Sequence, residues 1–217
     1  PVRYPHPTDK TSDAPDAVAV YRQLLSQQPD SSVVICTIGF LTNLKELLRS
    51  EGDAYSPLSG KELVARKVKR LVAMAGGFPQ GREFNVYCDL ESSKVVAEEW
   101  PTEILFSGFE IGEKILTGKK LVAMPTERSP VKEAFALSFA EGDPDGRMSW
   151  DQTAVLVAIK GYAPYFDIER GHFKLADAEG NNDWEVDPRG THARLLFRMT
   201  PARLAEVIEG YMMHLPQ

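Results

Sequence analysis

The chain lacks three features that would assign it to a membrane, nucleic-acid-binding or disulfide-rich class of protein. No apolar run approaches the ~18 residues needed to cross a bilayer, and the first residues, Pro-Val-Arg-Tyr-Pro, contain no apolar signal core. Basic residues are outnumbered 31 to 25 by acidic ones, and the net charge of −6 disfavours a phosphate-backbone partner. We therefore expect a water-soluble protein, cytoplasmic or exported after signal removal, that binds neither nucleic acid nor membrane.

Cysteine and histidine are also scarce. The two cysteines, Cys36 and Cys88, are too few for a zinc pattern or a disulfide framework, so we expect both to be reduced packing residues. No two of the four histidines have the spacing of metal ligands, and we expect them at surface or hairpin positions: His6, His172, His192 and His214.

What the sequence does contain is an alternation of strand and helix patterns. Apolar or β-branched runs predict strands that are buried on both faces, at residues 33–38, 70–75 and 103–107. Helical patterns lie between them, at residues 13–26 with Ser12 or Asp13 as the N-cap, and at 42–49, 60–67, 90–99 and 110–116. This alternation predicts an α/β fold with a mostly parallel sheet flanked by helices.

The pattern changes after residue 130. Two helices are predicted at residues 131–139 and 151–159, and a last one at 200–213. Residues 162–198 alternate around Gly and Asn turns, which predicts antiparallel hairpins. Because no linker or repeat interrupts residues 1–217, we expect a single domain, and the start at Pro rather than Met suggests an N-terminally truncated or processed portion of a protein.

Ligands of such sheets bind outside the carboxyl ends of the strands, so the residues that follow the apolar runs are the candidates. Glu83 and Asn85 flank Phe84, and in an extended stretch both polar side chains would share one side with Phe84 buried opposite. This pattern fits a surface loop with one anchoring aromatic side chain, and it also fits a pair that satisfies the donors and acceptors of a sugar.

Residues 149–152 have a purely structural interpretation. Ser149 and Gln152 have the spacing of a capping box, and Asp151 would favour the helix dipole. A carboxylate at the mouth of a parallel sheet also suits a hard cation such as Ca²⁺.

The order of four motifs is distinctive. Gly-Phe-Leu-Thr-Asn occupies residues 39–43, Ala-Met-Ala-Gly-Gly residues 73–77, Glu-Phe-Asn residues 83–85 and Asp-Leu-Glu residues 89–91. In this order and at this spacing, residues 33–160 resemble the inosine-uridine-preferring nucleoside hydrolases, a family of calcium-dependent N-glycosidases of α/β fold.

The resemblance implies roles for particular residues. Glu83 and Asn85 would hydrogen-bond ribose hydroxyls and Met74 would line the floor of the site, whereas Asp151 and the backbone carbonyl of Ile38 would bind Ca²⁺. The implied substrate is a small-molecule nucleoside, and the implied assembly is a homo-oligomer or an association with the N-terminal portion.

The chain departs from the family in three ways. Trp150 stands where many members have a His that acts as general acid; its indole either stacks on the nucleobase or packs in the core. The loop of residues 77–83 looks shorter and lacks a sugar-contacting Asn. The family's Asp-x-Asp-x-Gly-x-Asp-Asp cluster, which supplies two metal ligands and the base, is absent; the nearest acidic clusters, at 13–16 and 143–146, read as a helix cap and a turn.

Two functions follow from these patterns. The first is calcium-assisted hydrolysis of the N-glycosidic bond of ribonucleosides, which needs an N-terminal segment to supply the base. The second is a noncatalytic nucleoside- or ribose-binding protein of the same fold, which the loss of the His and the short sugar loop favour.

Overall fold

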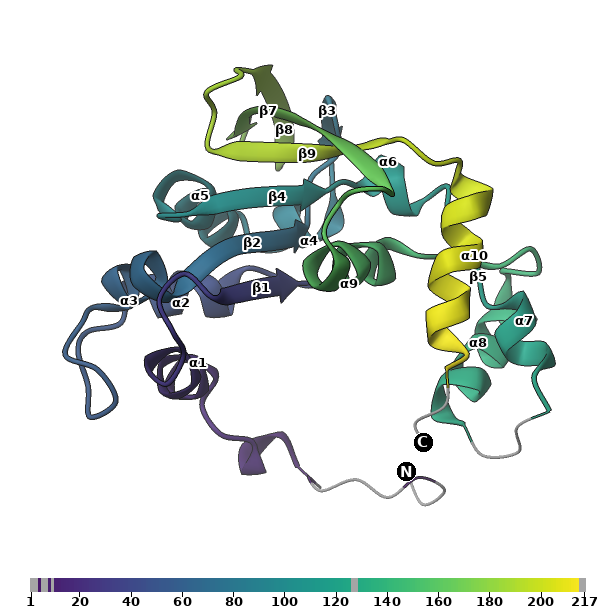
Figure 1. Cartoon of the computed structure of the whole chain (residues 1–217), viewed down its shortest axis with the longest axis horizontal. Helices are drawn as coiled ribbons and strands as arrows, with labels where there is room; N and C mark the ends of the chain where they lie inside the picture. Colours follow the sequence, from purple (N-terminus) through teal and green to yellow (C-terminus); the bar gives the residue numbers. More distant parts are fainter. Residues whose placement is uncertain (1–3, 5–7, 9, 126–128, 215–217) are drawn as a thin grey trace.

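Seven strands form one sheet in the order β1-β2-β4-β9-β7-β8-β3 (Figure 1). The structure is a computed structural model, and it describes residues 4, 8, 10–125 and 129–214. Four neighbouring strands are parallel: β1 (Val33–Thr37), β2 (Val68–Met74), β4 (Glu103–Ser107) and β9 (His192–Phe197). The other three continue the sheet with antiparallel pairing: β7 (Phe166–Leu175), β8 (Asn181–Val186) and β3 (Gln80–Arg82). The predicted α/β fold is confirmed.

Helices connect and cover the strands of the described chain. A short 3-10 turn, Thr11–Asp13, comes directly before the first helix. The α-helices in chain order are α1 (Ala17–Ser26), α2 (Thr42–Arg49), α3 (Gly60–Lys67), α4 (Phe84–Tyr87), α5 (Leu90–Glu99), α6 (Phe109–Gly112), α7 (Lys119–Ala123), α8 (Pro130–Glu141), α9 (Trp150–Lys160) and α10 (Pro201–Met212). A two-stranded antiparallel sheet, β5 (Leu116–Thr117) with β6 (Arg147–Met148), joins the segments before α7 and α9. No helix among the described residues is long and apolar enough to cross a bilayer.

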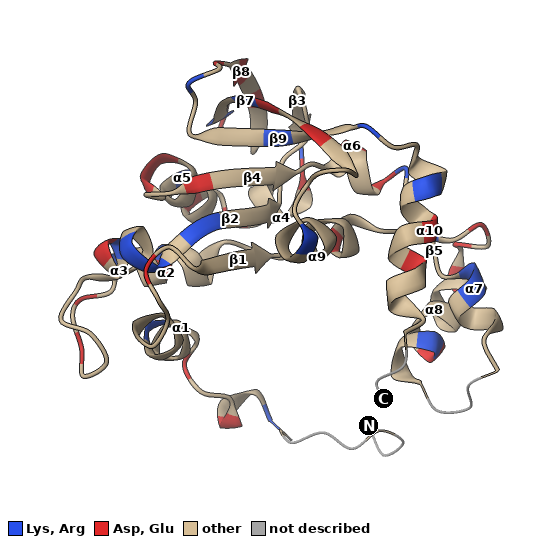
Figure 2. Cartoon of the chain, viewed as in Figure 1, with Lys and Arg blue, Asp and Glu red and all other residues tan. Residues whose placement is uncertain are grey.

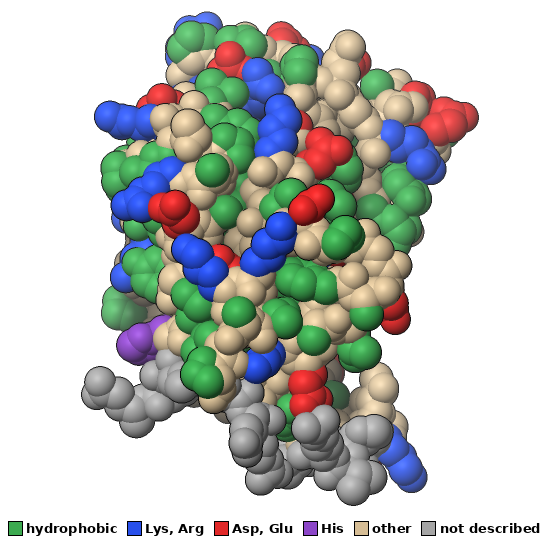
Figure 3. Space-filling model, turned by 90° about the vertical axis from the view of Figure 1, so that its right-hand side faces the viewer, with side chains coloured by type: hydrophobic (Ala, Val, Ile, Leu, Met, Phe, Trp, Pro, Cys, Tyr) green, Lys and Arg blue, Asp and Glu red, His purple; other side chains and the backbone are tan. Residues whose placement is uncertain are grey.

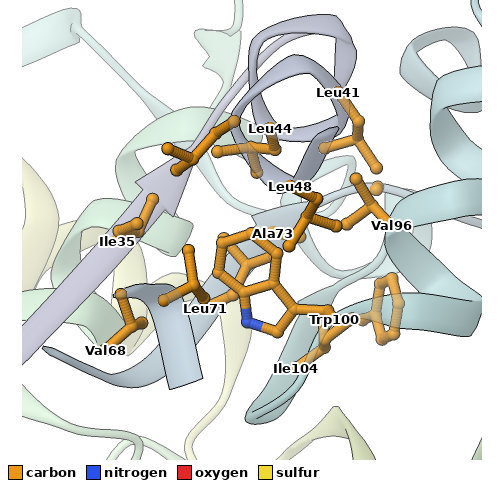
Figure 4. Close-up of a cluster of buried hydrophobic side chains, with 14 of the residues drawn as sticks. Ile35, Leu41, Leu44, Leu48, Val68, Leu71, Ala73, Val96, Trp100 and Ile104 are labelled. Atoms are coloured by element: carbon orange, nitrogen blue, oxygen red, sulfur yellow. The ribbon is translucent and has the colours of Figure 1, made fainter. Parts of the chain in front are cut away.

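Two layers of apolar side chains sandwich the parallel strands. On one face Leu71 and Ala73 of β2 pack with Leu44 of α2 and with Val96 and Trp100 from the region of α5 (Figure 4). The other face of β2 carries Val72 and Met74, which belong to a second cluster with residues of α9 and α10. Burial on both faces explains why these strands read as continuous apolar runs.

Several helix bounds match the sequence patterns, because local signals fix them. Helices α2, α3 and α5 have the predicted ends, and Thr200 caps α10 through the backbone N–H of Arg203. The first helix was placed wrongly: Asp16, not Ser12 or Asp13, is its N-cap and accepts a hydrogen bond from the Ala19 N–H.

One further prediction was wrong because tertiary contacts override a local pattern. The helix predicted at residues 110–116 ends at Gly112, and Leu116 instead pairs with Met148 in the small sheet. A side chain at Gly112 would lie 2.4 Å from the Trp150 Cα, so the close packing of α6 on α9 needs a glycine there. The antiparallel hairpins predicted at residues 162–198 are confirmed, because β7 pairs antiparallel with both β8 and β9. Residues 166–175 form one long strand, and β9 joins this region to the parallel sheet through β4.

Charged side chains are dispersed rather than segregated. Lys and Arg alternate with Asp and Glu over the helices and strand ends (Figure 2). On the face that carries α7, α8 and α10, residues of both signs lie among apolar side chains (Figure 3). Both cysteines are free, and Cys88 is exposed rather than a packing residue.

His192, expected at a surface or hairpin position, is instead buried at the start of β9 with 6% of its surface exposed. Its Nδ1 accepts a hydrogen bond from the Phe173 N–H at 3.0 Å, which requires the neutral ring. Burial, together with the nearby His172, lowers the pKa of His192 to about 4. His6 lies outside the described residues.

We predict that His192 makes folding stability depend on pH between about 6.5 and 4. Over this interval the unfolded chain binds a proton that the folded ring does not, so the free energy of unfolding falls as the pH falls, by about 3 kcal/mol in total. His192→Asn, whose side-chain oxygen can accept the same hydrogen bond, should flatten this part of the profile measured by urea denaturation. The control variant is His214→Asn, at an exposed position, and it should leave the profile unchanged. An unchanged profile in His192→Asn would contradict the conclusion that His192 causes this pH dependence.

Candidate active site

The carboxyl ends of β1, β2 and β4 point toward α4, α6 and the start of α9 (Figure 1). Met74 and Ser107 are neighbours in the ladder at the last positions of β2 and β4. Both side chains are buried, and the Ser107 hydroxyl has no hydrogen-bond partner among the described residues. This rim therefore contains both apolar and polar groups under the first turn of α9.

The Glu83 carboxylate is a centre of hydrogen bonding at this rim. It is 3% exposed, and it accepts hydrogen bonds from the backbone N–H groups of Asn85 at 2.9 Å and of Val86 and Gly76 at 3.2 Å. Burial raises the pKa of Glu83, and the three N–H donors oppose that rise. One carboxylate thus caps α4 and fixes the loop that follows β2.

Asn85 is buried beside Glu83 and contacts Met74. Its side-chain N–H group donates to the Met74 carbonyl oxygen at 3.0 Å and lies 3.3 Å from the Met74 sulfur. The expected extended geometry is wrong, because residues 84–87 form a turn of helix in which Phe84 is 56% exposed. Glu83 and Asn85 nevertheless share the inward side, because the helix turns Phe84 outward.

Two polar residues of this rim were missed by sequence reasoning. The Asn182 side chain accepts from the Gly77 N–H at 3.0 Å and donates to the Gly77 carbonyl at 2.8 Å. Glu110 accepts from the Phe78 N–H at 3.0 Å, and burial raises its pKa. Asn182 gives no local signal because it lies 105 positions away from Gly77; Glu110 resembled an ordinary helix residue.

Asp151 lies in the first turn of α9 with an exposed side chain. Partial loss of hydration raises the pKa of its carboxyl group. The negative charge of Asp151 also makes a small contribution to the raised pKa of Glu83. Burial also raises the pKa of the Cys36 thiol, to about 11, and the negative charge of Asp151 makes a smaller contribution to this rise. Asp151 therefore contributes negative charge to the side of the sheet that α9 covers.

Ile38 follows the last residue of β1 and lies beside Asp151. Both line a cleft of about 440 Å³ between α9 and α10, whose walls include Val155, Ile159 and Tyr211. Ile38 and Asp151 thus share one cleft, and Glu83, Asn85 and Met74 form a separate hydrogen-bonded group at the end of β2. The roles expected for these five residues stay predictions.

The donor set available for Ca²⁺ is incomplete. Calcium takes about 6–8 oxygen ligands, and the chemistry of Asp151 and of the Ile38 carbonyl suits it. No group of three or more His, Cys, Asp or Glu side chains able to hold a metal occurs among the residues that the structure describes. These residues fit as part of a calcium site and do not form a whole one.

Trp150 is held rigidly next to Asp151. Its indole N–H donates to the Phe109 carbonyl at 2.9 Å, and the two rings lie 5.3 Å apart. The indole also lines a second cleft, of about 270 Å³, between α8 and the start of α9. Ser149 does not form the expected capping box; its hydroxyl pairs with that of Thr117 at 2.7 Å, because the small sheet brings these residues together.

The chain thus combines a mostly parallel α/β sheet with a buried Glu-Asn pair at the end of β2 and an acidic residue at the start of α9. Residues 2–201 match the sequence model of the family described as inosine-uridine preferring nucleoside hydrolase. The chain belongs to this family. No curated protein sequence matches it significantly.

Several solved structures that are similar to the chain are nucleoside hydrolases. A plant enzyme, PpNRh1, superposes with a TM-score of 0.67 at 18% identity, covering 98% of this chain and 71% of its own. An inosine-guanosine nucleoside hydrolase superposes with a TM-score of 0.68 at 19% identity, and the match covers 97% of this chain and 72% of that enzyme. The inosine-uridine preferring nucleoside hydrolase of Bacillus anthracis superposes with a TM-score of 0.61 at 16% identity, and the match covers 92% of this chain and 65% of that enzyme. The chain therefore spans between 65% and 72% of the length of these three proteins.

We predict that Glu83→Ala destabilises the fold by about 3 kcal/mol, because it leaves three backbone N–H groups at a buried site without their acceptor. Urea denaturation of the variant and of Glu113→Ala, an exposed glutamate next to α6, would measure the difference. Equal stability of the two variants would mean that the Glu83 carboxylate does not hold this rim.

Proposed function

We propose that the protein hydrolyses the N-glycosidic bond of ribonucleosides with the assistance of Ca²⁺. Family and fold support N-glycosidic hydrolysis in general. The observation that carries the proposal is the buried Glu83 and Asn85 pair, which is tied to the end of β2, below a helix, α9, that packs on the same strand and carries Asp151 in its first turn.

Glu83, Asn85 and Met74 would hold the ribose. The backbone occupies three acceptor positions of the Glu83 carboxylate, which has about four. The Asn85 amide donates to Met74, and its carbonyl oxygen is the group that remains to accept from a hydroxyl. A rigid acceptor pair of this kind would orient the sugar, so that binding favours one shape of the ring.

When bound, Ca²⁺ would supply a positive charge that orients the attacking water and the ribose hydroxyls. Asp151 and the Ile38 carbonyl are the residues of this chain that would hold it, and the adjoining cleft gives access to both. The remaining ligands, and a base for the water, would come from a segment outside the described residues.

The free edge of β1 is where such a segment would join. The strand is the last of the sheet on that side, and Val34 is exposed. Ile38, Val155 and Ile159 add exposed apolar surface beside it, with Ile159 72% exposed. An unpaired strand next to apolar surface is a template for another strand, and a strand paired there would end at the rim that carries Asp151.

Trp150 would stack on the nucleobase. Its side chain is half-buried, anchored through its N–H and open to the 270 Å³ cleft. An indole cannot protonate the leaving base, so Trp150 would contribute binding and not acid catalysis.

A noncatalytic nucleoside- or ribose-binding protein is the second candidate. The specific observation that favours it is the indole at the position next to Asp151, where a proton donor would be needed to activate the leaving base. In that case the rim would bind the sugar without cleaving it.

We predict that Asp151→Asn lowers calcium affinity and hydrolysis together, because the neutral amide is a weaker ligand for a hard cation. Calorimetric titration with CaCl₂ and release of base from inosine and uridine, in the complete protein, are the measurements; we expect at least a tenfold loss in each, of the size typical of an interaction worth about 1.4 kcal/mol or more.

The matched control is Asp145→Asn, which neutralises an exposed aspartate paired with Lys119 on a neighbouring loop. It should leave both measurements unchanged. Undiminished calcium binding in Asp151→Asn would remove the metal assignment. Thermal stabilisation by inosine or uridine without turnover of either would favour the binding protein.

A further inference from the structure

The first and the last of the four ordered motifs have no role in the proposed chemistry, yet they meet in the structure. Thr42 belongs to the motif of residues 39–43 and is the first residue of α2. Asp89 begins the motif of residues 89–91 and is the N-cap of α5. The Thr42 hydroxyl donates a hydrogen bond to the Asp89 carboxylate, which lies 47 positions further along the chain.

The Asp89 carboxylate serves the starts of two helices at once. Its Oδ1 accepts from the Ser92 N–H at 3.1 Å and so caps α5, whereas its Oδ2 accepts from Thr42. Helix α2 has no acidic residue in its first turn, and its N-cap, Leu41, makes no side-chain cap. Because negative charge is favourable at a helix N-terminus, Asp89 stabilises α2 as well as α5.

A ring contact connects the same two parts of the chain. Phe40 lies between β1 and α2, and Phe84 is the first residue of α4; their ring centroids are 5.8 Å apart. The segment of residues 38–42, after β1, and the segment of residues 83–89, after β2 and β3, are therefore connected at two places. We call them the first and the second rim segment.

Helices α2 and α5 are also connected at their other ends. They pack against each other, and Arg49 pairs with Glu99 at 2.7 Å at the last residue of each helix. Start meets start and end meets end, so the two helices run parallel. The bond between Thr42 and Asp89 is the connection at the rim, and the Arg49 pair is a connection of the same helices away from it.

Each rim segment contains a group that the proposed function needs. Ile38 begins the first rim segment, and Glu83 begins the second, where it caps α4. A shift of one segment against the other would move the Ile38 carbonyl relative to the Glu83 carboxylate. A misplacement of about 1 Å that arises far from the chemistry can lower a rate by about 10²-fold, so the connection matters beyond its effect on stability.

We propose that Thr42 is a positioning residue, which through Asp89 fixes the two rim segments relative to each other. The Thr42 hydroxyl touches neither sugar nor metal in this arrangement; it holds backbone that does. The inference rests on the proposed function for the roles of Ile38 and Glu83, whereas the connection itself can be measured without calcium or substrate.

The first measurement is amide hydrogen exchange of the complete protein without ligands, followed by mass spectrometry of its peptides. Thr42→Val keeps the size of the side chain and removes the donor. It should speed exchange in both rim segments about tenfold, the change in a local opening equilibrium that loss of a hydrogen bond to a charged group gives. Thr42→Ser, which keeps the hydroxyl, should exchange like the unaltered protein.

The second measurement is calcium titration and hydrolysis of inosine by the complete protein. Thr42→Val should weaken calcium binding about threefold or more and lower kcat about tenfold or more, because the two groups are no longer held in one geometry. KM should change less than about threefold, since the Glu83 and Asn85 pair remains. Thr42→Ser should restore each value to within about twofold of the unaltered protein.

The matched control is Arg49→Met, which removes the connection between the same two helices at their far ends. It should lower the melting temperature about as much as Thr42→Val does, and it should leave exchange in the rim segments, calcium affinity and kcat unchanged. Thr42→Ala, which lacks the hydroxyl but favours a helix, provides the same test if Thr42→Val does not fold.

Unchanged exchange in either rim segment of Thr42→Val, or equal losses of kcat in Thr42→Val and Arg49→Met, would overturn the proposal. So would a failure of Thr42→Ser to restore kcat. Faster exchange in both segments of Thr42→Val, in a protein that binds no calcium and cleaves no nucleoside, would uphold the connection, while the proposed hydrolysis would fall.

Discussion

A parallel sheet must bury both of its faces, and the arrangement of the site depends on this constraint. The residues of β2 alternate between two apolar layers, one shared with α2 and α5 and the other with α9 and α10. Because α9 has to cover the second face, its buried residues Ala154 and Val157 lie over the strands. Its first turn then falls at the carboxyl ends of β1 and β2, and this places Asp151 in the same cleft as Ile38.

The rim after β2 has no strand ladder of its own, and side chains hold its backbone instead. Glu83 binds Gly76, Asn182 binds Gly77 and Glu110 binds Phe78, so three consecutive residues are fixed from three elements. Gly76 has a φ of 79°, a conformation that L side chains rarely adopt. A binding surface made of restrained backbone is suited to orient a sugar, because little order has to be gained when the sugar binds.

Asp151 separates two clefts of different character. The cleft toward α10 is mostly apolar and leads to the free edge of β1, whereas the cleft toward α8 carries Arg147 and Trp150. In the proposed hydrolase the first side would receive further calcium ligands and the base, and the second would receive the nucleobase.

The sequence by itself determined the strands buried on both faces, most helix ends and the order of the motifs, because these depend on local caps and on apolar periodicity. Asp89 and Thr200, for example, are N-cap residues of types that favour this position, and each directly precedes a helical pattern in the sequence. Only the tertiary structure decided that α6 stops at Gly112 and that Ser149 bonds to Thr117 rather than capping α9. It also decided that Glu83 turns inward while Phe84 turns outward, and that Asn182 reaches Gly77. Each of these outcomes depends on contacts between residues far apart in the chain, whose energies no local pattern contains.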